Sequence, residues 1–269
     1  MRLLILQESI GKFVAHYIYH KIITHQQNTD QPFVLGLPTG STPLIMYQEL
    51  IKLYQQHQIS FKNVVTFNMD EYVGLDADNK QSYHYYMFQN FFNHIDIQKD
   101  NIHILNGCAN NLETECINFE NKIIQYGGID LMVGGIGEDG HIAFNEPGSS
   151  FNSITRIKTL NHSTILANSR FFDNDIVLTP KTALTMGIKT ILNAKEIIIL
   201  ACGANKSHAV MQAIEGSVSS MCPVTALQMH NKTALMCDEY AAYELKLKTI
   251  KYFANMEDHY TKYDNSSCL

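Results

Sequence analysis

The sequence predicts an α/β protein with a Rossmann-like, open and mainly parallel sheet and helices on both faces. Short apolar runs of the length of buried strands alternate with segments whose apolar residues recur at helical spacing. Three polar loops, each following one of these runs, resemble ligand-binding loops at the carboxyl ends of parallel strands. We interpret residues 1–269 as a single domain.

The expected elements follow one another along the chain, starting from a first strand at the very beginning. Residues 33–37 form a continuous apolar run of strand length between polar segments, and residues 43–55 carry apolar side chains at helical spacing. Further strands are expected at 64–67, 129–133 and 196–201, with helices at 82–93 and after Asn205.

The composition excludes several classes of protein. A formal net charge of −6, from 20 basic and 26 acidic residues, argues against a general nucleic-acid or anionic-membrane surface. Residues 1–20 lack the pattern of a signal peptide, and no apolar run approaches the ~18 residues of a membrane span. Six scattered cysteines without a C-x-x-C pair favour a reducing compartment. We therefore expect a cytoplasmic protein.

The first polar loop, Thr39-Gly40-Ser41-Thr42, lies between a strand and a helix. Its backbone N–H groups and hydroxyls could hold a phosphate at the start of the helix. The loop lacks the Gly-Lys-Ser/Thr of a nucleotide P-loop. It could equally be a strand-to-helix turn with a hydroxyl cap, because Ser and Thr are common caps.

The second loop, Asn68-Met69-Asp70-Glu71-Tyr72, presents two adjacent carboxylates. They could be a solvated turn. The end of a buried strand is partly desolvated, however, and desolvation raises a carboxyl pKa toward useful base strength. Asp70 is therefore a candidate base.

The third loop, VGGIGEDGHIAFNEPGSS at 133–150, contains the G-x-G-x-x-G spacing of a dinucleotide-binding loop. That interpretation is rejected, because Glu138 and Asp139 would face the pyrophosphate and the segment that follows is a poor helix. The glycines instead allow a tight bend in which Asp139, His141 and Glu146 converge. A histidine between two carboxylates indicates acid–base chemistry.

Four runs resemble the glucosamine-6-phosphate deaminase family: LGLPTGSTP, FNMDEYVGL, GGIGEDGHIAFNEPGSS and ANSRFFDND. The resemblance covers about residues 1–255 and leaves 256–269 as a C-terminal tail without an assigned role. It implies hydrolytic deamination of glucosamine 6-phosphate to fructose 6-phosphate and ammonia, in amino-sugar catabolism and N-acetylglucosamine utilisation. It implies no metal and no organic cofactor.

The resemblance also implies a division of labour among the candidate residues. Asp70 would take the proton from C2 of the open-chain sugar, and His141 would open the pyranose ring. Asp139 and Glu146 would orient and tune that imidazole. The phosphate would be held by Thr39, Gly40, Ser41, Thr42, Arg170 and Lys206.

A regulatory site is implied as well. In allosteric members of the family, a set of residues binds N-acetylglucosamine 6-phosphate between subunits. The family includes both hexamers and monomers, and the resemblance at these positions implies a homohexamer activated by this ligand. Arg156 and Lys158 alternate, so a strand would point both to one side, although such a pair is also compatible with a solvated face. The matching positions here are Met1, Ser149, Ser150, Arg156, Lys158, Thr159 and Tyr252.

Two departures and two rival functions accompany the resemblance. The chain has no Trp near residues 220–222, where the family usually has one, and it carries an extra charge at Glu138. A 6-phosphogluconolactonase would share the fold and the phosphate loop without needing Asp70 at C2. A non-catalytic sugar-phosphate sensor would need a DNA-reading module, and none is apparent in the sequence.

Overall fold

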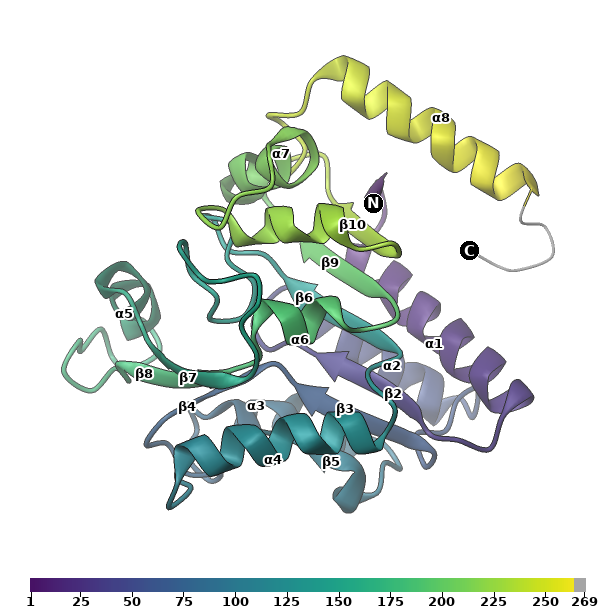
Figure 1. Ribbon diagram of the computed structural model, residues 1–269. Helices are drawn as coiled ribbons and strands as arrows, with labels where there is room; N and C mark the ends of the chain where they lie inside the picture. The colour runs from purple at the N-terminus through teal and green to yellow at the C-terminus, as the bar shows by residue number, and fades with distance from the viewer. Residues whose placement is uncertain (264–269) are drawn as a thin grey trace.

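Figure 1 shows the computed structural model, which describes residues 1–263, with side chains as far as Glu257. Its centre is a seven-stranded sheet in the order β1-β10-β9-β6-β2-β3-β5, in which every pairing is parallel. The predicted open parallel sheet is confirmed. Its strands are β1 (Arg2–Ile5), β2 (Phe33–Leu37), β3 (Val64–Asn68), β5 (Ile102–His103), β6 (Leu131–Gly135), β9 (Ile197–Ala201) and β10 (Thr233–Cys237).

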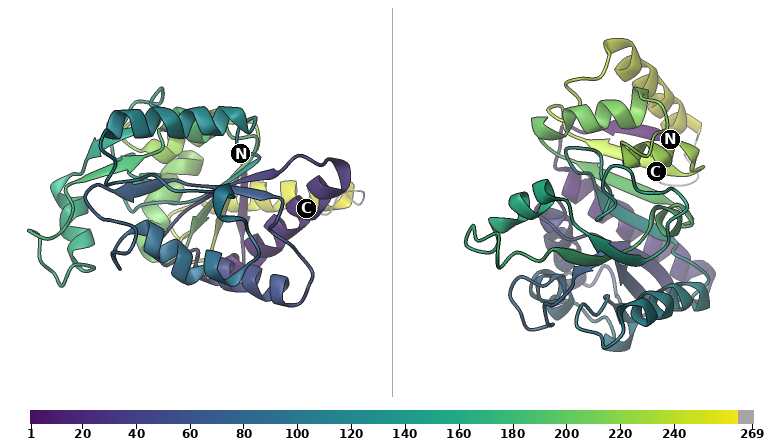
Figure 2. Two further views of the ribbon diagram at one scale, coloured as in Figure 1. Left: turned by 90° about the horizontal axis from the view of Figure 1, so that it is seen from below. Right: turned by 60° about the vertical axis from the view of Figure 1, so that its left-hand side comes forward.

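Helices cover both faces of this sheet (Figures 1 and 2). Alternate side chains of a strand enter different cores. Val34 belongs to a cluster with buried residues of the helices at 112–125 and 207–215, whereas Phe33 and Leu35 belong to a cluster with buried residues of the helices at 10–28, 44–55 and 83–90. The helices are α1 (Ile10–Asn28), α2 (Leu44–Gln55), α3 (Tyr83–Asn90), α4 (Leu112–Gln125), α5 (His162–Ser169), α6 (Ile188–Leu192), α7 (Ser207–Glu215) and α8 (Leu247–Tyr263).

A second, three-stranded antiparallel sheet stands beside the main one. It has the order β4-β8-β7, with β4 (Asp70–Tyr72), β8 (Thr182–Thr185) and β7 (Arg156–Thr159). The strand expected around Arg156 and Lys158 is confirmed. The other two strands were not predicted, because a three-residue strand such as Asp-Glu-Tyr is too short to show a periodic pattern.

Element boundaries follow local chemistry. α3 begins after Ser82, whose hydroxyl accepts a hydrogen bond from the Tyr85 N–H, and ends at Asn90 rather than at residue 93. α1 was not predicted. The expected tail is helical at its start, since α8 continues to Tyr263, and residues 264–269 lie outside the described part.

Among the described helices, none is both long and apolar enough to cross a bilayer.

Candidate functional site

The candidate site lies where four segments leave the carboxyl edge of the main sheet (Figure 1). β9, β6, β2 and β3 are consecutive parallel neighbours, so the segments that follow them emerge on the same side. In the same order, these segments carry Lys206, the Asp139–His141 pair, the Thr39–Thr42 loop and Asp70. The topology thus brings residues from distant parts of the chain to one edge.

The loop after β2 has the form of an anion-binding turn. Gly40 has a φ of +110°, and a Cβ at this position would meet no atom within 4 Å, so a ligand can approach the backbone closely. The hydroxyls of Tyr47 and Tyr86 donate to the carbonyls of Pro38 and Gly40, each at 2.5 Å, and fix the loop. No backbone N–H of Thr39–Thr42 donates to any described residue. These donors can therefore serve an anion at the start of α2.

The competing interpretation of this loop was a hydroxyl cap. α2 begins after Pro43, and no described side chain makes a capping hydrogen bond at that end. The hydroxyls of Ser41 and Thr42 are thus available for a ligand rather than used by the helix.

Asp70 is a buried carboxyl of base strength. It is 8% exposed, and its burial, together with the neighbouring charge of Glu71, raises the pKa of Asp70 to about 8. The Glu71 carboxylate instead accepts hydrogen bonds from the backbone N–H groups of Tyr72, Tyr83 and His84, and so anchors the start of α3. The two adjacent carboxyls therefore differ in role: one is structural and the other is left for chemistry.

His141 forms an oriented pair with Asp139. The Asp139 Oδ1 lies 2.6 Å from His141 Nδ1 and accepts the His141 backbone N–H at 3.1 Å, which holds the pKa of Asp139 below its usual range. Gly137 is required beside the ring, because a Cβ there would lie 2.1 Å from the imidazole. Gly140 turns the chain between the two at a φ of +80°. The His141 side chain is 36% exposed, so the imidazole can reach a ligand.

Glu146 does not join this pair. One of its carboxylate oxygens accepts hydrogen bonds from the Asn161 N–H at 2.9 Å and the Thr164 hydroxyl at 2.5 Å. The other lies 3.4 Å from the Lys158 ammonium. The sequence predicted that Glu146 orients the imidazole of His141. Among the described residues, no hydrogen bond or salt bridge joins these two side chains. The side chain points instead toward α5 and β7.

Arg170 and Lys206 supply positive charge at the same edge. Burial lowers the pKa of Lys206, against the opposing effects of Glu138 and Asp139, and the Arg170 charge also lowers it. Glu138, the extra acidic residue, accepts a hydrogen bond from the Asn205 amide at 2.6 Å. Neither Arg170 nor Lys206 forms a salt bridge with a described residue. Two neighbouring cations that form no salt bridge with a described residue suit a phosphate.

The residues proposed from the sequence for regulation fall into two groups. Met1 and Tyr252 lie with β1 and α8 at one edge of the main sheet, whereas the other group lies on and just before β7 in the small sheet (Figure 1). Tyr252 is 61% exposed. The buried Ser149 hydroxyl has no hydrogen-bond partner among the described residues. The second group comprises Ser149, Ser150, Arg156, Lys158 and Thr159.

Sequence reasoning missed the residues that hold these groups in place. The hydroxyls of Tyr47 and Tyr86 fix the loop after β2, yet in the sequence they are ordinary tyrosines on helices. Asn145 and Thr185 are completely buried polar residues, and each makes one hydrogen bond to a backbone group 41 residues away in the sequence. No local pattern in the sequence indicates such bonds.

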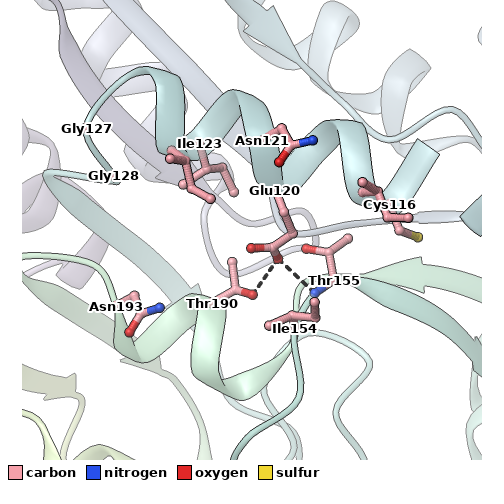
Figure 3. Close-up of a pocket in the computed structure, with 12 residues that line it drawn as sticks. Cys116, Glu120, Asn121, Ile123, Gly127, Gly128, Ile154, Thr155, Thr190 and Asn193 are labelled. Atoms are coloured by element: carbon pink, nitrogen blue, oxygen red, sulfur yellow. Dashed lines mark hydrogen bonds between the residues drawn. The ribbon is translucent and has the colours of Figure 1, made fainter. Parts of the chain in front are cut away.

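A pocket of about 570 Å³ lies elsewhere, between α4, α6 and the segment leading into β7 (Figure 3). The Glu120 carboxylate in its wall accepts hydrogen bonds from the Thr155 N–H at 2.8 Å and the Thr190 hydroxyl at 2.6 Å. Its carboxylate is therefore engaged in tying α4 to its neighbours. None of the candidate catalytic or phosphate-binding residues lines this pocket.

The fold and the site together define an α/β enzyme with acid–base groups and an anion loop at the carboxyl edge of a parallel sheet. The chain belongs to the family described as glucosamine-6-phosphate isomerases/6-phosphogluconolactonase, whose family model matches residues 7–236.

Curated relatives lie within the deaminase branch of that family. The glucosamine-6-phosphate deaminase of Phocaeicola vulgatus is 56% identical over 250 residues, covering 93% of this chain and 95% of the relative. That of Tolumonas auensis is 56% identical over 259 residues, covering 96% and 97%. The chain thus belongs to the glucosamine-6-phosphate deaminase family.

Solved structures agree on the fold. A structure described as a monomeric glucosamine-6-phosphate deaminase is 41% identical, with a TM-score of 0.86 over 90% of this chain and 99% of that one. A 6-phosphogluconolactonase from Thermotoga maritima has a TM-score of 0.71 at 19% identity, over 88% of this chain and 99% of that one. The second likeness concerns the fold alone.

Proposed function

We propose that this chain is a glucosamine-6-phosphate deaminase, a cytoplasmic enzyme of amino-sugar catabolism that serves N-acetylglucosamine utilisation. It converts D-glucosamine 6-phosphate and water to D-fructose 6-phosphate and ammonia. The observation that carries the proposal is the buried Asp70 at the same sheet edge as the Asp139–His141 pair and an open anion loop. The identity of more than half to curated deaminases supports the same substrate.

Substrate binding rests on the phosphate. The backbone N–H groups of Thr39–Thr42 and the hydroxyls of that loop surround the anion at the start of α2. Arg170 provides a planar guanidinium and Lys206 an ammonium, and neither forms a salt bridge with a described residue. Anchoring one end of the sugar leaves its C1 and C2 atoms to the acid–base groups.

The chemistry is a series of proton transfers. His141 takes the proton from the C1 hydroxyl and delivers one to the ring oxygen, so the C1–O5 bond breaks and the aldehyde forms. Asp70 takes the proton from C2 while a proton passes from the C2 ammonium to O1, which gives an enolamine between C1 and C2. Returning the proton from Asp70 to C1 then gives a protonated imine at C2. Water adds to that carbon and ammonia leaves, which gives the ketose phosphate. The sequence of steps uses side chains of the protein and needs no metal or organic cofactor.

The raised pKa of Asp70 fits this role. A base with a pKa of about 8 binds a proton from carbon more strongly than an ordinary carboxylate does. The substrate ammonium at C2 places a positive charge beside Asp70, and that charge favours the ionised form. The carboxyl thus becomes the reactive base where the substrate is bound.

We further propose that the enzyme is an allosteric homohexamer activated by N-acetylglucosamine 6-phosphate. The two groups of candidate effector residues lie on different parts of one chain, so an anion can contact both only between neighbouring copies. The contact of 3.4 Å between Lys158 and Glu146 supports a link to catalysis. An effector phosphate would compete with Glu146 for Lys158 and release a carboxylate of the catalytic loop.

The small sheet supports a second link. Arg156 of β7 and Asp70 of β4 are both register partners of Thr185 in the central strand β8. A shift of β7 on effector binding would therefore be transmitted through the central strand β8 to β4 and Asp70. Preferential binding of the effector to one quaternary state would shift the population toward that state.

The activity is tested by offering two substrates side by side. Ammonia from glucosamine 6-phosphate, with no acid from 6-phosphogluconolactone, supports the deaminase. The reverse result supports the lactonase. Binding of a sugar phosphate without either product would indicate a sensor. Rate curves with and without N-acetylglucosamine 6-phosphate, together with the mass of the particle in solution, test the regulation.

A further inference from the structure

The proposed base and the proposed ring-opening residue stand on different parts of the fold. Asp70 belongs to β4 of the small sheet, and His141 lies on the loop that follows β6 of the main sheet. Successive proton transfers on one sugar require a fixed spacing between these two groups, since misplacement by about 1 Å can cost two orders of magnitude in rate. Some contact must therefore hold the two segments in register.

The backbone N–H and carbonyl of Met186, just past the end of β8, make this contact. Its N–H donates to the Met69 carbonyl at 2.8 Å, immediately before Asp70. Its carbonyl accepts the Asn145 amide at 2.8 Å and the Thr185 hydroxyl at 3.2 Å. The backbone of this one residue is thus bonded through its N–H to the strand of the base and through its carbonyl to two buried side chains.

The side chains of Asn145 and Thr185 also form hydrogen bonds with the backbone of the loop that carries His141. The same Asn145 amide donates to the Ile142 carbonyl at 2.9 Å, and the Thr185 hydroxyl accepts the Phe144 N–H at 3.1 Å. Both side chains are 0% exposed. Ala143 lies between the hydrogen-bonded Ile142 carbonyl and Phe144 N–H and has a φ of +52°. This left-handed conformation persists only where the surroundings enforce it.

We propose that Asn145 and Thr185 are positioning residues that set the spacing between Asp70 and His141. The proposal rests on the proposed function, because it takes the roles of those two residues from it. Neither side chain forms a hydrogen bond with Thr39–Thr42 or Arg170 among the described residues. Loss of either should therefore slow the chemical steps and leave substrate binding nearly unchanged.

The test compares Thr185→Val with Thr185→Ser in the full-length chain. Valine preserves the shape and removes the hydroxyl, whereas serine keeps it. We expect Thr185→Val to lower kcat for ammonia release about 10- to 100-fold while KM changes less than about threefold. Thr185→Ser should stay within about threefold of the parent in both constants. Asn145→Leu, which removes both amide donors, should behave like Thr185→Val.

The matched control is Thr190→Val. Thr190 is 4% exposed, and the substitution removes the hydrogen bond that its hydroxyl donates to Glu120 in the pocket of Figure 3. It should keep the parental kcat. Unchanged kcat in Thr185→Val and Asn145→Leu, or an equal fall in Thr190→Val, overturns the proposal. If Thr185→Val does not fold, the comparison is decided with Asn145→Leu. A parent that releases no ammonia contradicts the proposed function instead.

Discussion

Replacing Asp70 with asparagine removes the proposed base while preserving its shape. We expect Asp70→Asn to fold, to bind the sugar phosphate and to lose deamination by roughly two to four orders of magnitude, the range for loss of a general base. In the parent, kcat/KM should rise with pH up to about 8, because the base must be ionised and burial raises the pKa of Asp70 to about 8.

The same substitution should stabilise the protein. An acid whose pKa is raised by folding binds its proton more tightly in the folded state, so its contribution to stability falls as pH rises from 3.8 to about 8. At about 1.36 kcal/mol for each pH unit above 3.8, this cost is roughly 2 kcal/mol at pH 5 and roughly 4 kcal/mol at pH 7. Asparagine does not titrate. The variant should therefore exceed the parent in free energy of unfolding by amounts that grow with pH.

The assay pairs initial rates of ammonia release with urea unfolding at pH 5 and pH 7. Asp96→Asn is the matched control, because the Asp96 carboxylate accepts hydrogen bonds from the Ser60 hydroxyl and the Phe61 N–H, both at 2.7 Å, away from the site. It should be less stable and fully active. Near-parental turnover in Asp70→Asn, or a stability loss like that of Asp96→Asn, would refute the reasoning.

Further substitutions test the ring-opening histidine, the phosphate-binding cations and the proposed effector site. His141→Gln should slow turnover of the closed pyranose more than that of an acyclic analogue, and equal losses would assign the imidazole to another step. Removing Arg170 or Lys206 should weaken binding of the phosphorylated substrate by about 1.5–3 kcal/mol each, and unchanged dependence on the phosphate would place the anion elsewhere. Arg156→Ala with Lys158→Ala should abolish activation by N-acetylglucosamine 6-phosphate and leave the rate at saturating substrate unchanged. If the parent shows a hyperbolic dependence of rate on substrate that the activator does not change, the proposed allosteric regulation is contradicted.

Local patterns predicted the main sheet well. β2 forms over the expected residues 33–37, because a continuous apolar run buried on both faces is a strong signal. In the small sheet, β4 and β8 escaped prediction, since β4 is a three-residue strand defined by its pairing with the distant β8. Chain order alone cannot supply such a partner.

In the candidate site, too, some features could be predicted from the sequence and others could not. The pairing of Asp139 with His141 is local, two residues apart, and the sequence indicates it. Glu146 is also close in sequence, yet its carboxylate points to Asn161, Thr164 and Lys158, because the tight loop turns it away from the imidazole. Sequence spacing therefore identifies which residues carry chemistry better than it identifies where their side chains point.

The most direct test of the central claim is the product balance from glucosamine 6-phosphate in the parent and in Asp70→Asn. The account predicts ammonia and fructose 6-phosphate in equal amounts from the parent, and neither above roughly a hundredth of that rate from the folded variant. Ammonia released at the parental rate by the variant, or no ammonia from the parent, would contradict it.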